Sequence, residues 1–553
     1  MDESSDAPSR RPTDAFPVLT KREIEAVSKL GPAQSFEPGD LLFEAGQREF
    51  DCHVVLTGEV EIIDTTGDSP RLVTTHLPGE FTGDVDLLRG RPALVRARAK
   101  TPVSTIRLSR TAVREALVRV PSVGDKFVTA FHRRRQLLEE SGFEGLRVFG
   151  QRDDPKTLQL REFLHRNGVL HRWLDSADPA HLETLERLDC AQPRFPVLAC
   201  SRHVIYQQPT LTEIAEDVGI QRVISRDIYD TVIIGAGPSG LGAAVYAASE
   251  GLSTLVLDSV GPGGQAGSSS KIENYAGFPS GISGRELALR SQLQAMKFGA
   301  EITAPCSALR LSCDHQSIHE IETCLGTTVR TRTIIISTGV SYRQLDIPGL
   351  DQFRGRGVYH AATKIESVLC EELPIHIVGA GNSAGQAAMF LSQCSERVNL
   401  IVRGGNLTKS MSEYLSSRVL ANPNIQVLFH TEVTGVTGRE MLEQVTLRNH
   451  AEDRTWEEAT AGLFIFIGAK PATDFLGGRV ARDERGFILT GPQVMEADLW
   501  PLPGRTPCAL ETSCPGVFAS GDCRSGTTKR VAFAIGDGAL AVSCVHDFLG
   551  TYS

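Results

Sequence analysis

Hydrophobic and polar residues alternate in short runs over the first part of the chain, from about residue 17 to 140. The run HVVLTGEVEIID at residues 53–64 and the following LVTTHLPGEFTGD contain glycine turns, which is typical of antiparallel strands. Many short strands of this kind predict a β-roll or jelly-roll barrel. A helical pattern then extends from Thr111 to about Glu140.

The next segment, residues 145 to 222, has a mixed pattern. It predicts a strand at LRVFG, an amphipathic helix at PKTLQLREFLHRNG that stops at Gly168, and a second strand at HRWLD. FPVLAC and HVIYQ then predict a hairpin, and TLTEIAEDVGI predicts a closing helix whose N-cap is Thr210 or Thr212. We therefore expect a small α/β module here.

From Asp227 to the end, strand and helix patterns alternate twice over, which is typical of parallel, doubly wound α/β domains. The length of 553 residues is enough for about three to five domains. A net charge of −10 argues against nucleic-acid binding, and the absence of a run of about 18 apolar residues argues against a membrane span. The polar first 16 residues predict a disordered lead-in rather than a secretory signal.

Twelve cysteines are scattered through the chain, and no two of them stand as CxxC. Scattered cysteines in a long chain are typical of reduced thiols, so we expect a cytoplasmic protein. The nearest approach to a CxxC pair is Cys508 with Cys514, and we assign no metal site from the sequence.

The segment DTVIIGAGPSGLGAAVYAASEGLSTLVLD has glycines in the GxGxxG spacing between an apolar strand and an Ala-rich helix. Gly235 permits a tight turn, Gly237 lets a pyrophosphate approach the backbone, and Gly240 lets the helix pack closely on the strand. The pyrophosphate then lies at the helix N-terminus, where free N–H groups and the helix dipole favour an anion. Asp258 follows the second strand at the spacing of a ribose-hydroxyl acceptor, which completes a predicted dinucleotide site.

A second glycine loop lies in PIHIVGAGNSAGQAAMFLSQCSERVNLIVRGG, at Gly379 and Gly381. The strand that follows it leads into Arg403 instead of an acid. An arginine at this place suits the 2′-phosphate of NADPH, whereas an acid would suit NAD. Lys409 and Arg418 could assist, and a solvated basic loop is the alternative interpretation.

From Asp227 to the C-terminus the chain closely resembles the low-molecular-weight thioredoxin reductases. Six blocks carry the resemblance in order: GAGPSG, PGGQAGSSSKIENYAGFPSGISGREL, IISTGVSYRQLDIPGLDQFRGRGVYHAAT, GAGNSAG, FIFIGAKPATDFL and GVFASGDCRSGTTKRVAFAIGDGALA. The resemblance implies a homodimeric oxidoreductase that binds FAD and NADPH.

The resemblance also assigns roles to single residues. On the FAD side the contacts would be Gly235, Gly237, Pro238, Ser239, Gly240, Asp258, Gly264, Gln265, Asn274, Thr338, Gly339, Gly521, Asp522, Arg530, Val531 and Ala532. On the NADPH side they would be Gly379, Gly381, Asn382, Ser383, Ala384 and Arg403. Of the three arginines that commonly hold the 2′-phosphate in the family, only Arg403 is present, because Gly404 and Thr408 replace the other two.

The redox cysteines of the family are missing. Where thioredoxin reductases carry CATC, this chain reads Ala361, Ala362, Thr363 and Lys364. Thiol–disulfide exchange needs an attacking thiolate and a resolving thiol, so electrons cannot leave a flavin here by that route. Cys370 stands alone and is expected to be a buried apolar side chain. We expect His360 to be a structural hydrogen-bonding residue, with a group facing the flavin as the alternative.

Residues 17 to 140 resemble cyclic-nucleotide-binding domains of the catabolite-activator type. FEPGDLLFEAG and VVLTGEVEI match the early strands, and GDVDLLRGRPALVRARA occupies the place of the phosphate-binding cassette. The family uses Gly-Glu and an arginine just before a small residue. This chain offers Gly83 with Asp84, and Arg91 or Ala93 depending on the alignment. The domain either binds a cyclic nucleotide or is a degenerate docking or dimerisation module.

Residues 145 to 222 resemble a thioredoxin or glutaredoxin fold. Phe195, Pro196 and Val197 match its cis-proline turn. The dithiol position reads Asp153, Asp154, Pro155 and Lys156, so the module is expected to be redox-inactive, with Cys190 and Cys200 structural.

These observations predict a lead-in at 1–16, a cyclic-nucleotide-binding-like domain at 17–142, a thioredoxin-like domain at 143–224, an FAD domain at 225–347 and 470–553, and an NAD(P)H domain at 348–469. We expect an enzyme that passes hydride from NADPH to FAD and electrons to an unidentified acceptor. Three alternatives stay open: a reductase of a partner's disulfide, a redox sensor with little turnover, and a ferredoxin reductase-like enzyme.

Overall fold

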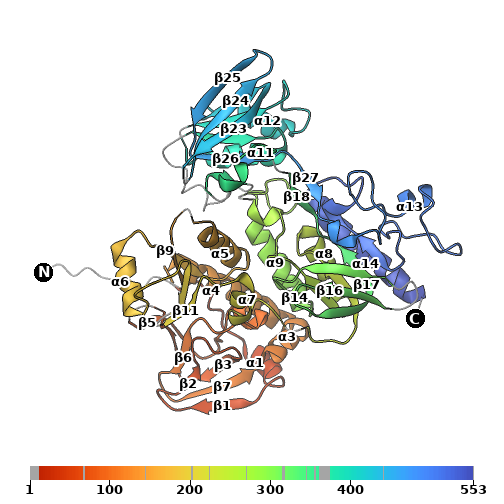
Figure 1. Ribbon diagram of the computed structural model, residues 1–553. Helices are drawn as coiled ribbons and strands as arrows, with labels where there is room; N and C mark the ends of the chain where they lie inside the picture. The colour runs from red at the N-terminus through yellow and green to blue at the C-terminus, as the bar shows by residue number, and fades with distance from the viewer. Residues whose placement is uncertain are drawn as a thin grey trace. The chain divides into compact units, whose positions relative to one another are not determined.

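The computed structural model describes residues 11–66, 69–143, 145–152, 154–200, 203–222, 224–269, 271–313, 318–343, 345–353, 356–359, 374–395, 397–439 and 441–551 (Figure 1). The chain divides into two compact units. The first contains Met1–Gly150, Asn167–Arg222 and Leu293–Ala300, and the second contains Gln151–Arg166, Val223–Gln292 and Glu301–Ser553.

Two antiparallel sheets begin the first unit. One has the order β1 (Ala33–Phe36), β7 (Val103–Leu108), β3 (Cys52–Thr57), and the other the order β2 (Leu41–Phe43), β6 (Arg96–Ala99), β4 (Val60–Asp64), β5 (Arg71–His76). Apolar side chains such as Val54, Phe81 and Ile106 are buried in this part of the unit. The predicted β-roll is confirmed.

Four helices belong to this β-roll domain: α1 (Lys21–Val27), α2 (Val85–Arg89), α3 (Arg110–Arg119) and α4 (Pro121–Glu140). The helical stretch predicted from Thr111 to about Glu140 is confirmed, but it is broken into two helices at Val120, whose φ is −126° and ψ is 76°. A proline disfavours the helical conformation of the residue before it, so Pro121 ends one helix and starts the next.

The middle module has the sheet order β11 (His203–Gln207), β10 (Val197–Cys200), β8 (Leu146–Gly150), β9 (His171–Asp175). β8 and β9 are parallel, and β10 is antiparallel to both of its neighbours. The helices α5 (Pro155–Arg166) and α7 (Leu211–Asp217) were predicted, with Thr210 as the N-cap of α7. The sequence pattern did not indicate α6 (Pro179–Arg187), which Asp178 caps. The Phe195–Pro196 peptide is cis, as predicted.

The second unit contains a mostly parallel sheet. Its order is β14 (Glu301–Thr303), β13 (Thr254–Leu257), β12 (Tyr229–Ile234), β17 (Thr328–Ile336), β16 (His319–Thr323), β15 (Ala308–Ser312). A late strand, β28 (Val517–Ala519), pairs in parallel with the last residues of β17. Helices α8 (Pro238–Ser249) and α9 (Gly284–Lys297) follow β12 and β13 in sequence.

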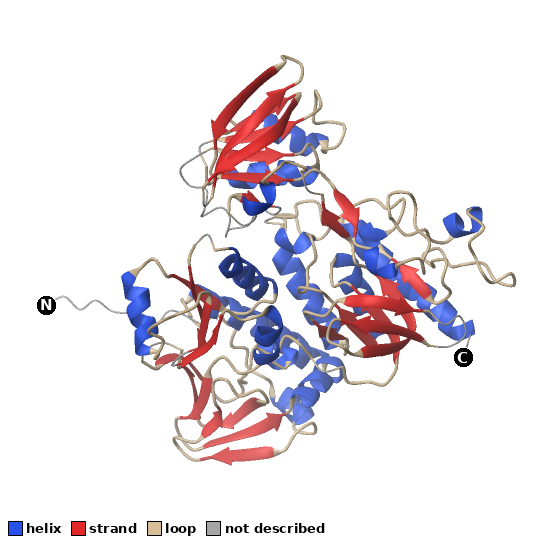
Figure 2. Ribbon diagram, in the orientation of Figure 1, coloured by secondary structure: helices blue, strands red, loops and turns tan. Residues whose placement is uncertain are grey.

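A second parallel sheet has the order β19 (Val358–Tyr359), β26 (Gly462–Ile465), β20 (Ile375–Val378), β21 (Val398–Val402), β22 (Ile425–Phe429), with α11 (Asn382–Leu391) and α12 (Glu413–Ala421). Figure 2 shows three further antiparallel strands as long arrows side by side: β23 (Thr431–Gly438), β24 (Leu442–Asn449) and β25 (Arg454–Ala459). The pair β18 (Val340–Tyr342) and β27 (Ala469–Pro471) marks where the chain leaves and re-enters the first sheet's domain. Two α/β domains are thus confirmed, and their exact limits stay a prediction.

The last helix, α14 (Val531–Thr551), is long and apolar enough by length and composition to cross a membrane, with a mean hydropathy of 1.4. The sequence contains no unbroken apolar run here because Asp537 and glycines interrupt it. The helix packs closely on α8: a Cβ added at Gly538 would lie 2.1 Å from the carbonyl oxygen of Ser239, and one at Gly242 3.1 Å from that of Ile535. One side of α14 therefore packs against α8, and 33% of its apolar window is buried.

Cys508 and Cys544 form a disulfide, with their Cα atoms 5.8 Å apart. The expectation that every cysteine is a reduced thiol was therefore wrong. Their separation of 36 residues gave no sign of the pairing, which arises because α14 brings Cys544 back beside the loop before β28. Eight other described cysteines form no disulfide.

Candidate dinucleotide site

The first glycine loop leaves no room for side chains. Gly235 follows β12 with a φ of +107°, and a Cβ there would lie 2.4 Å from the carbonyl oxygen of Ser337. A Cβ at Gly240 would lie 1.8 Å from the carbonyl oxygen of Gly235. The backbone therefore makes a tight turn and carries α8 close against the strand.

Helix α8 begins at this turn, with Gly237 as its N-cap in an extended conformation. No side chain caps the helix, so its first N–H groups remain available to an anion, which the helix dipole also favours. A Cβ at Gly237 would face the Cα of Gly264 at 3.8 Å, so two glycine-bearing loops border one space.

Three distant segments meet through serine hydroxyls beside the loop. The Ser520 hydroxyl lies 2.8 Å from the Ser239 hydroxyl and 2.7 Å from the Ser337 hydroxyl. Ser239 is on α8, Ser337 follows β17, and Ser520 follows β28. The site is therefore assembled only when the C-terminal strand β28 joins the first sheet.

A cavity of about 470 Å³ lies at this junction. Its lining includes these sequence-predicted residues: Gly235, Gly237, Pro238, Ser239, Asp258, Gly264, Gln265, Asn274, Thr338, Gly339, Asn382, Ser383, Asp522, Arg530 and Val531. The cavity thus gathers residues predicted from five separate sequence blocks. The predicted residues outside the lining are Gly240, Gly379, Gly381, Ala384, Arg403, Gly521 and Ala532.

Asp258 supports the glycine loop directly. One of its carboxylate oxygens accepts the N–H of Ala236 at 2.7 Å, and the other accepts the N–H groups of Val260 and Gly261 at 3.0 and 2.8 Å. A carboxylate oxygen can accept more than one hydrogen bond, so the side chain can also receive a ribose hydroxyl. Sequence spacing suggested the ribose role, but not the role of Asp258 in fixing the turn.

Gln265 presents an acceptor that the protein does not satisfy. Its amide nitrogen donates to the carbonyl oxygen of Val340 at 3.3 Å, while its Oε1 is buried without a hydrogen-bond partner. Leaving a buried acceptor unpaired costs about 1–3 kcal/mol. Because Gln265 lines the cavity, a ring N–H of a bound flavin would satisfy this oxygen, and the residues present fit FAD.

Asp522 lies in the short turn before α14. Burial raises the pKa of its carboxyl group, which the nearby charge of Lys529 opposes and that of Asp537 reinforces. Gly521, with a φ of +71°, allows this turn, and a Cβ there would lie 2.8 Å from the Cβ of Ser239. The turn therefore fits closely beside the start of α8.

The second glycine loop repeats the geometry of the first. Gly379 has a φ of +144°, and a Cβ there would lie 2.4 Å from the carbonyl oxygen of Phe466. Gly381 is the N-cap of α11, where no side chain caps the helix. Asn382 instead accepts the N–H of Ser412 at 2.8 Å through its Oδ1, and Ala384 is buried beneath the loop. The N-terminus of α11 is a second place where a phosphate can bind.

Arg403 is exposed directly after β21, beside this loop. Lys409, predicted as a helper, is also exposed. Arg418 donates to Glu273 at 2.8 Å and also contacts the Tyr414 hydroxyl, so it is engaged within the protein. The predicted binding of a 2′-phosphate thus depends mainly on Arg403.

Several predicted positions lie outside the described residues: His360, the four residues 361–364 that replace the redox motif, Cys370, and Asp153 of the dithiol position. The absence of the two redox cysteines is therefore known from the sequence and not from the structure.

The N-terminal domain encloses a second cavity, of about 630 Å³. Gly83, Asp84 and Ala93 line it, but Arg91 does not. Arg91 is 5% exposed, donates to the carbonyl oxygen of Asn167 at 2.7 Å and lies 3.6 Å from the Asp86 carboxylate. The predicted phosphate arginine is therefore committed to partners within its own unit.

Comparisons with known proteins agree with this geometry. Residues 229–538 match the family model described as pyridine nucleotide-disulphide oxidoreductase, and residues 33–119 match that of the cyclic nucleotide-binding domain. Thioredoxin reductase of Treponema pallidum is 32% identical over 323 residues, which cover 58% of this chain and 98% of that protein. Thioredoxin reductase of Streptomyces clavuligerus is also 32% identical, over 58% of this chain and 94% of its own length.

Among solved structures, thioredoxin reductase of Lactococcus lactis aligns with a TM-score of 0.53 and 30% identity, over 58% of this chain and 99% of its own. The family match extends over more than half of the chain and includes both glycine loops. The chain therefore belongs to the pyridine nucleotide-disulphide oxidoreductase family, as a thioredoxin reductase-like oxidoreductase with a cyclic nucleotide-binding domain at its N-terminal end.

Proposed function

We propose that this protein binds FAD in the 470 Å³ cavity and NADPH at the second glycine loop, and that it passes electrons to an acceptor other than thioredoxin. The observation that carries the proposal is the cavity itself. Three chain segments joined by serine hydroxyls line it, and the unpaired Oε1 of Gln265 is a buried acceptor in the same lining. FAD would supply the chemistry of hydride acceptance, while the protein binds and orients the two nucleotides.

The test is an anaerobic titration of the purified full-length chain with NADPH. We expect a yellow protein whose flavin absorbance bleaches at about one equivalent of NADPH, and whose FAD leaves on denaturation. Addition of a quinone or a dye should restore the oxidised spectrum repeatedly, which distinguishes an enzyme from a redox sensor. A colourless protein that cannot be reconstituted with FAD would contradict the proposal.

The acceptor is proposed from the missing redox motif. Ala361 and Lys364 stand where relatives of this type carry the two cysteines of CATC. We expect no reduction of thioredoxin by NADPH, although the same preparation turns over with a dye. Flavin reduction by NADPH should survive alkylation of every accessible cysteine, because that half-reaction needs no thiol. Loss of transfer to the acceptor after alkylation, with FAD still bound, would refute the thiol-free route.

The cavity of the N-terminal domain is proposed to bind cyclic nucleotides weakly or not at all. The domain family suggests a cyclic nucleotide ligand, but Arg91 is already paired and Asp84 lies where the family has glutamate. An arginine–phosphate contact is worth about 1.5–3 kcal/mol, so its loss weakens binding roughly 10- to 150-fold. Calorimetry with cyclic AMP and cyclic GMP checks this. A micromolar dissociation constant that Arg91→Ala abolishes would overturn it.

We also propose a cytoplasmic homodimer. Eight described cysteines form no disulfide and stand outside the Cys508–Cys544 pair, which supports a reducing compartment. Large apolar side chains on α8 and α14 are exposed, namely Tyr246, Phe533 and Leu540, and a second copy could cover them. Light scattering of the purified protein at several concentrations tests the dimer.

A further inference from the structure

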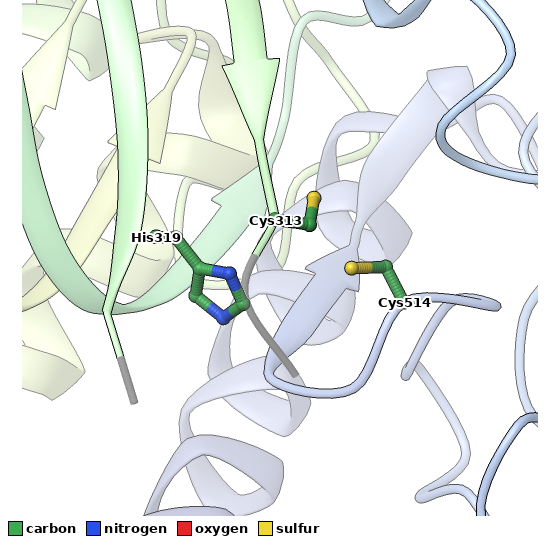
Figure 3. A group of neighbouring side chains, drawn as sticks. All are labelled: Cys313, His319 and Cys514. Atoms are coloured by element: carbon green, nitrogen blue, oxygen red, sulfur yellow. The ribbon is translucent and has the colours of Figure 1, made fainter. Parts of the chain in front are cut away.

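Two cysteines and a histidine from distant parts of the sequence come together at the edge of the first sheet of the second unit (Figure 3). Cys313 directly follows β15, His319 is the first residue of β16, and Cys514 lies in the loop that leads into β28. One ligand atom from each residue lies within 4.8 Å of those of the other two. None of the three lines the dinucleotide cavity, so the cluster is separate from the proposed flavin site.

The histidine is buried with an unpaired nitrogen. His319 is 1% exposed, and its Nδ1 has no hydrogen-bond partner. The other side of the ring fits against Gly516, where an added Cβ would lie 2.8 Å from Nε2. A buried ring nitrogen without a partner costs free energy, so this arrangement calls for a ligand at Nδ1.

The two sulfur atoms lie within 4.8 Å of each other. Cys514 is 2% exposed, and Cys313 is half-buried against the core that contains Cys514. The thiol groups of Cys313 and Cys514 are hydrogen-bonded to each other. Two neutral thiols are weak hydrogen-bonding groups, whereas a cation between them would stabilise both as thiolates.

We propose that Cys313, His319 and Cys514 bind a Zn²⁺ ion through two thiolate sulfurs and one imidazole nitrogen. Thiolate and imidazole are the ligands that zinc prefers among protein side chains. In a tetrahedral zinc site with Zn–S near 2.3 Å and Zn–N near 2.0 Å, ligand atoms lie roughly 3.4–3.8 Å apart. The largest separation here therefore has to shrink by about 1 Å on binding, and the three side chains leave the fourth tetrahedral position to another donor.

The position of the cluster means that a bound ion would connect two segments of the sheet. It would join the β15–β16 hairpin to the segment that enters β28, and β28 is followed by Ser520, whose hydroxyl is hydrogen-bonded to Ser239 and Ser337 of the cavity lining. Zinc binding is thus expected to stabilise the C-terminal segment against the rest of its sheet. The proposal does not depend on the identity of the electron acceptor or on the occupancy of the cavity.

The experiment uses the reduced full-length chain, freed of metal with a chelator and titrated with Zn²⁺ alone against a chromophoric zinc indicator. We expect one zinc per chain, release of protons on binding, and a raised thermal midpoint. Cys313→Ser, His319→Gln and Cys514→Ser should each weaken zinc binding at least 10-fold. Cys394→Ser removes an exposed cysteine outside the cluster and is expected to bind zinc like the parent.

Cobalt provides a second readout that needs no variant. Co²⁺ bound to the parent chain should give sulfur-to-metal charge-transfer absorption that zinc displaces, and this measurement decides the matter if a variant fails to fold. The proposal is overturned if the parent binds zinc no more tightly than the three variants, or if Co²⁺ gives no sulfur-dependent absorption. It is equally overturned if peptide mapping of the untreated chain finds a Cys313–Cys514 disulfide, which would make the pair a redox couple.

Discussion

Gly240→Ala is expected to yield a colourless protein that does not retain FAD. A Cβ at this position would lie 1.8 Å from the carbonyl oxygen of Gly235, which is a backbone atom and cannot rotate away. Overpacking of a tightly packed interior costs about 1–3 kcal/mol, and here the strain falls on the turn that approaches the pyrophosphate. A loss of about 3 kcal/mol of binding free energy lowers affinity more than 100-fold. The ratio of flavin to protein absorbance after gel filtration measures the effect.

Gly536→Ala is the matched control. Gly536 is an exposed glycine of α14 with no atom near an added Cβ, and alanine in a helix is more favourable than glycine by about 0.5–1 kcal/mol. This variant should keep its FAD and unfold at the same or a slightly higher temperature. A yellow Gly240→Ala protein with the flavin content of the parent would contradict the placement of the pyrophosphate at this loop.

Arg403→Ala is expected to remove most of a preference for NADPH over NADH. Arg403 follows β21 beside the second glycine loop. The resemblance to thioredoxin reductases implies two further arginines at this loop, but this chain has Gly404 and Thr408 at those positions. One charge-assisted contact with the 2′-phosphate is worth about 1.5–3 kcal/mol, so kcat/KM for NADPH should fall roughly 10- to 150-fold. The value for NADH should stay unchanged, because NADH has no phosphate at that position. Stopped-flow flavin reduction with both donors provides the comparison.

Arg448→Ala controls for a general loss of positive charge. Arg448 is on β24 of the same domain and pairs with the exposed Asp453, away from the glycine loop. Its removal should leave both rates unchanged. Equal rates with NADPH and NADH in the parent protein would refute the assignment of Arg403 to the phosphate.

The glycine loops could be predicted because their chemistry is local. The turn, the close helix and the acid after the next strand lie within one βαβ unit, so spacing alone locates Gly235, Gly237 and Asp258. The break at Val120 could have been seen in the same way, since Pro121 marks it. Helix α6 was missed although Asp178 and Pro179 form an ordinary helix start, because a segment of only 9 residues is too short for its pattern to identify a helix.

The thiol chemistry could not be predicted, because its partners are distant in the sequence. The Cys508–Cys544 bridge and the cluster around His319 each depend on where the C-terminal segment returns to the sheet. Local motifs such as CxxC are the signal that a sequence offers for such chemistry, and neither group contains one. Arg91 is the opposite case, because its motif is local and visible in the sequence. In the structure its side chain is buried against Asp86 and the carbonyl of Asn167, and the motif did not predict these contacts.

Strand β28 is synthesised after the other strands of the sheet that it joins, and this order affects when the pocket can form. Val517–Ala519 pairs with Ile334–Ile336, and Ser520 joins Ser239 and Ser337, so the pocket needs residues translated long after its glycine loop. During synthesis the earlier domains emerge and fold first, and the intervening nucleotide domain can follow. Until β28 is synthesised, Ile334–Ile336 of β17 lack the partner that β28 provides, and the pocket is unfinished. A ribosome-stalled chain ending before residue 517 should therefore fail to capture FAD, while release of the finished chain permits it.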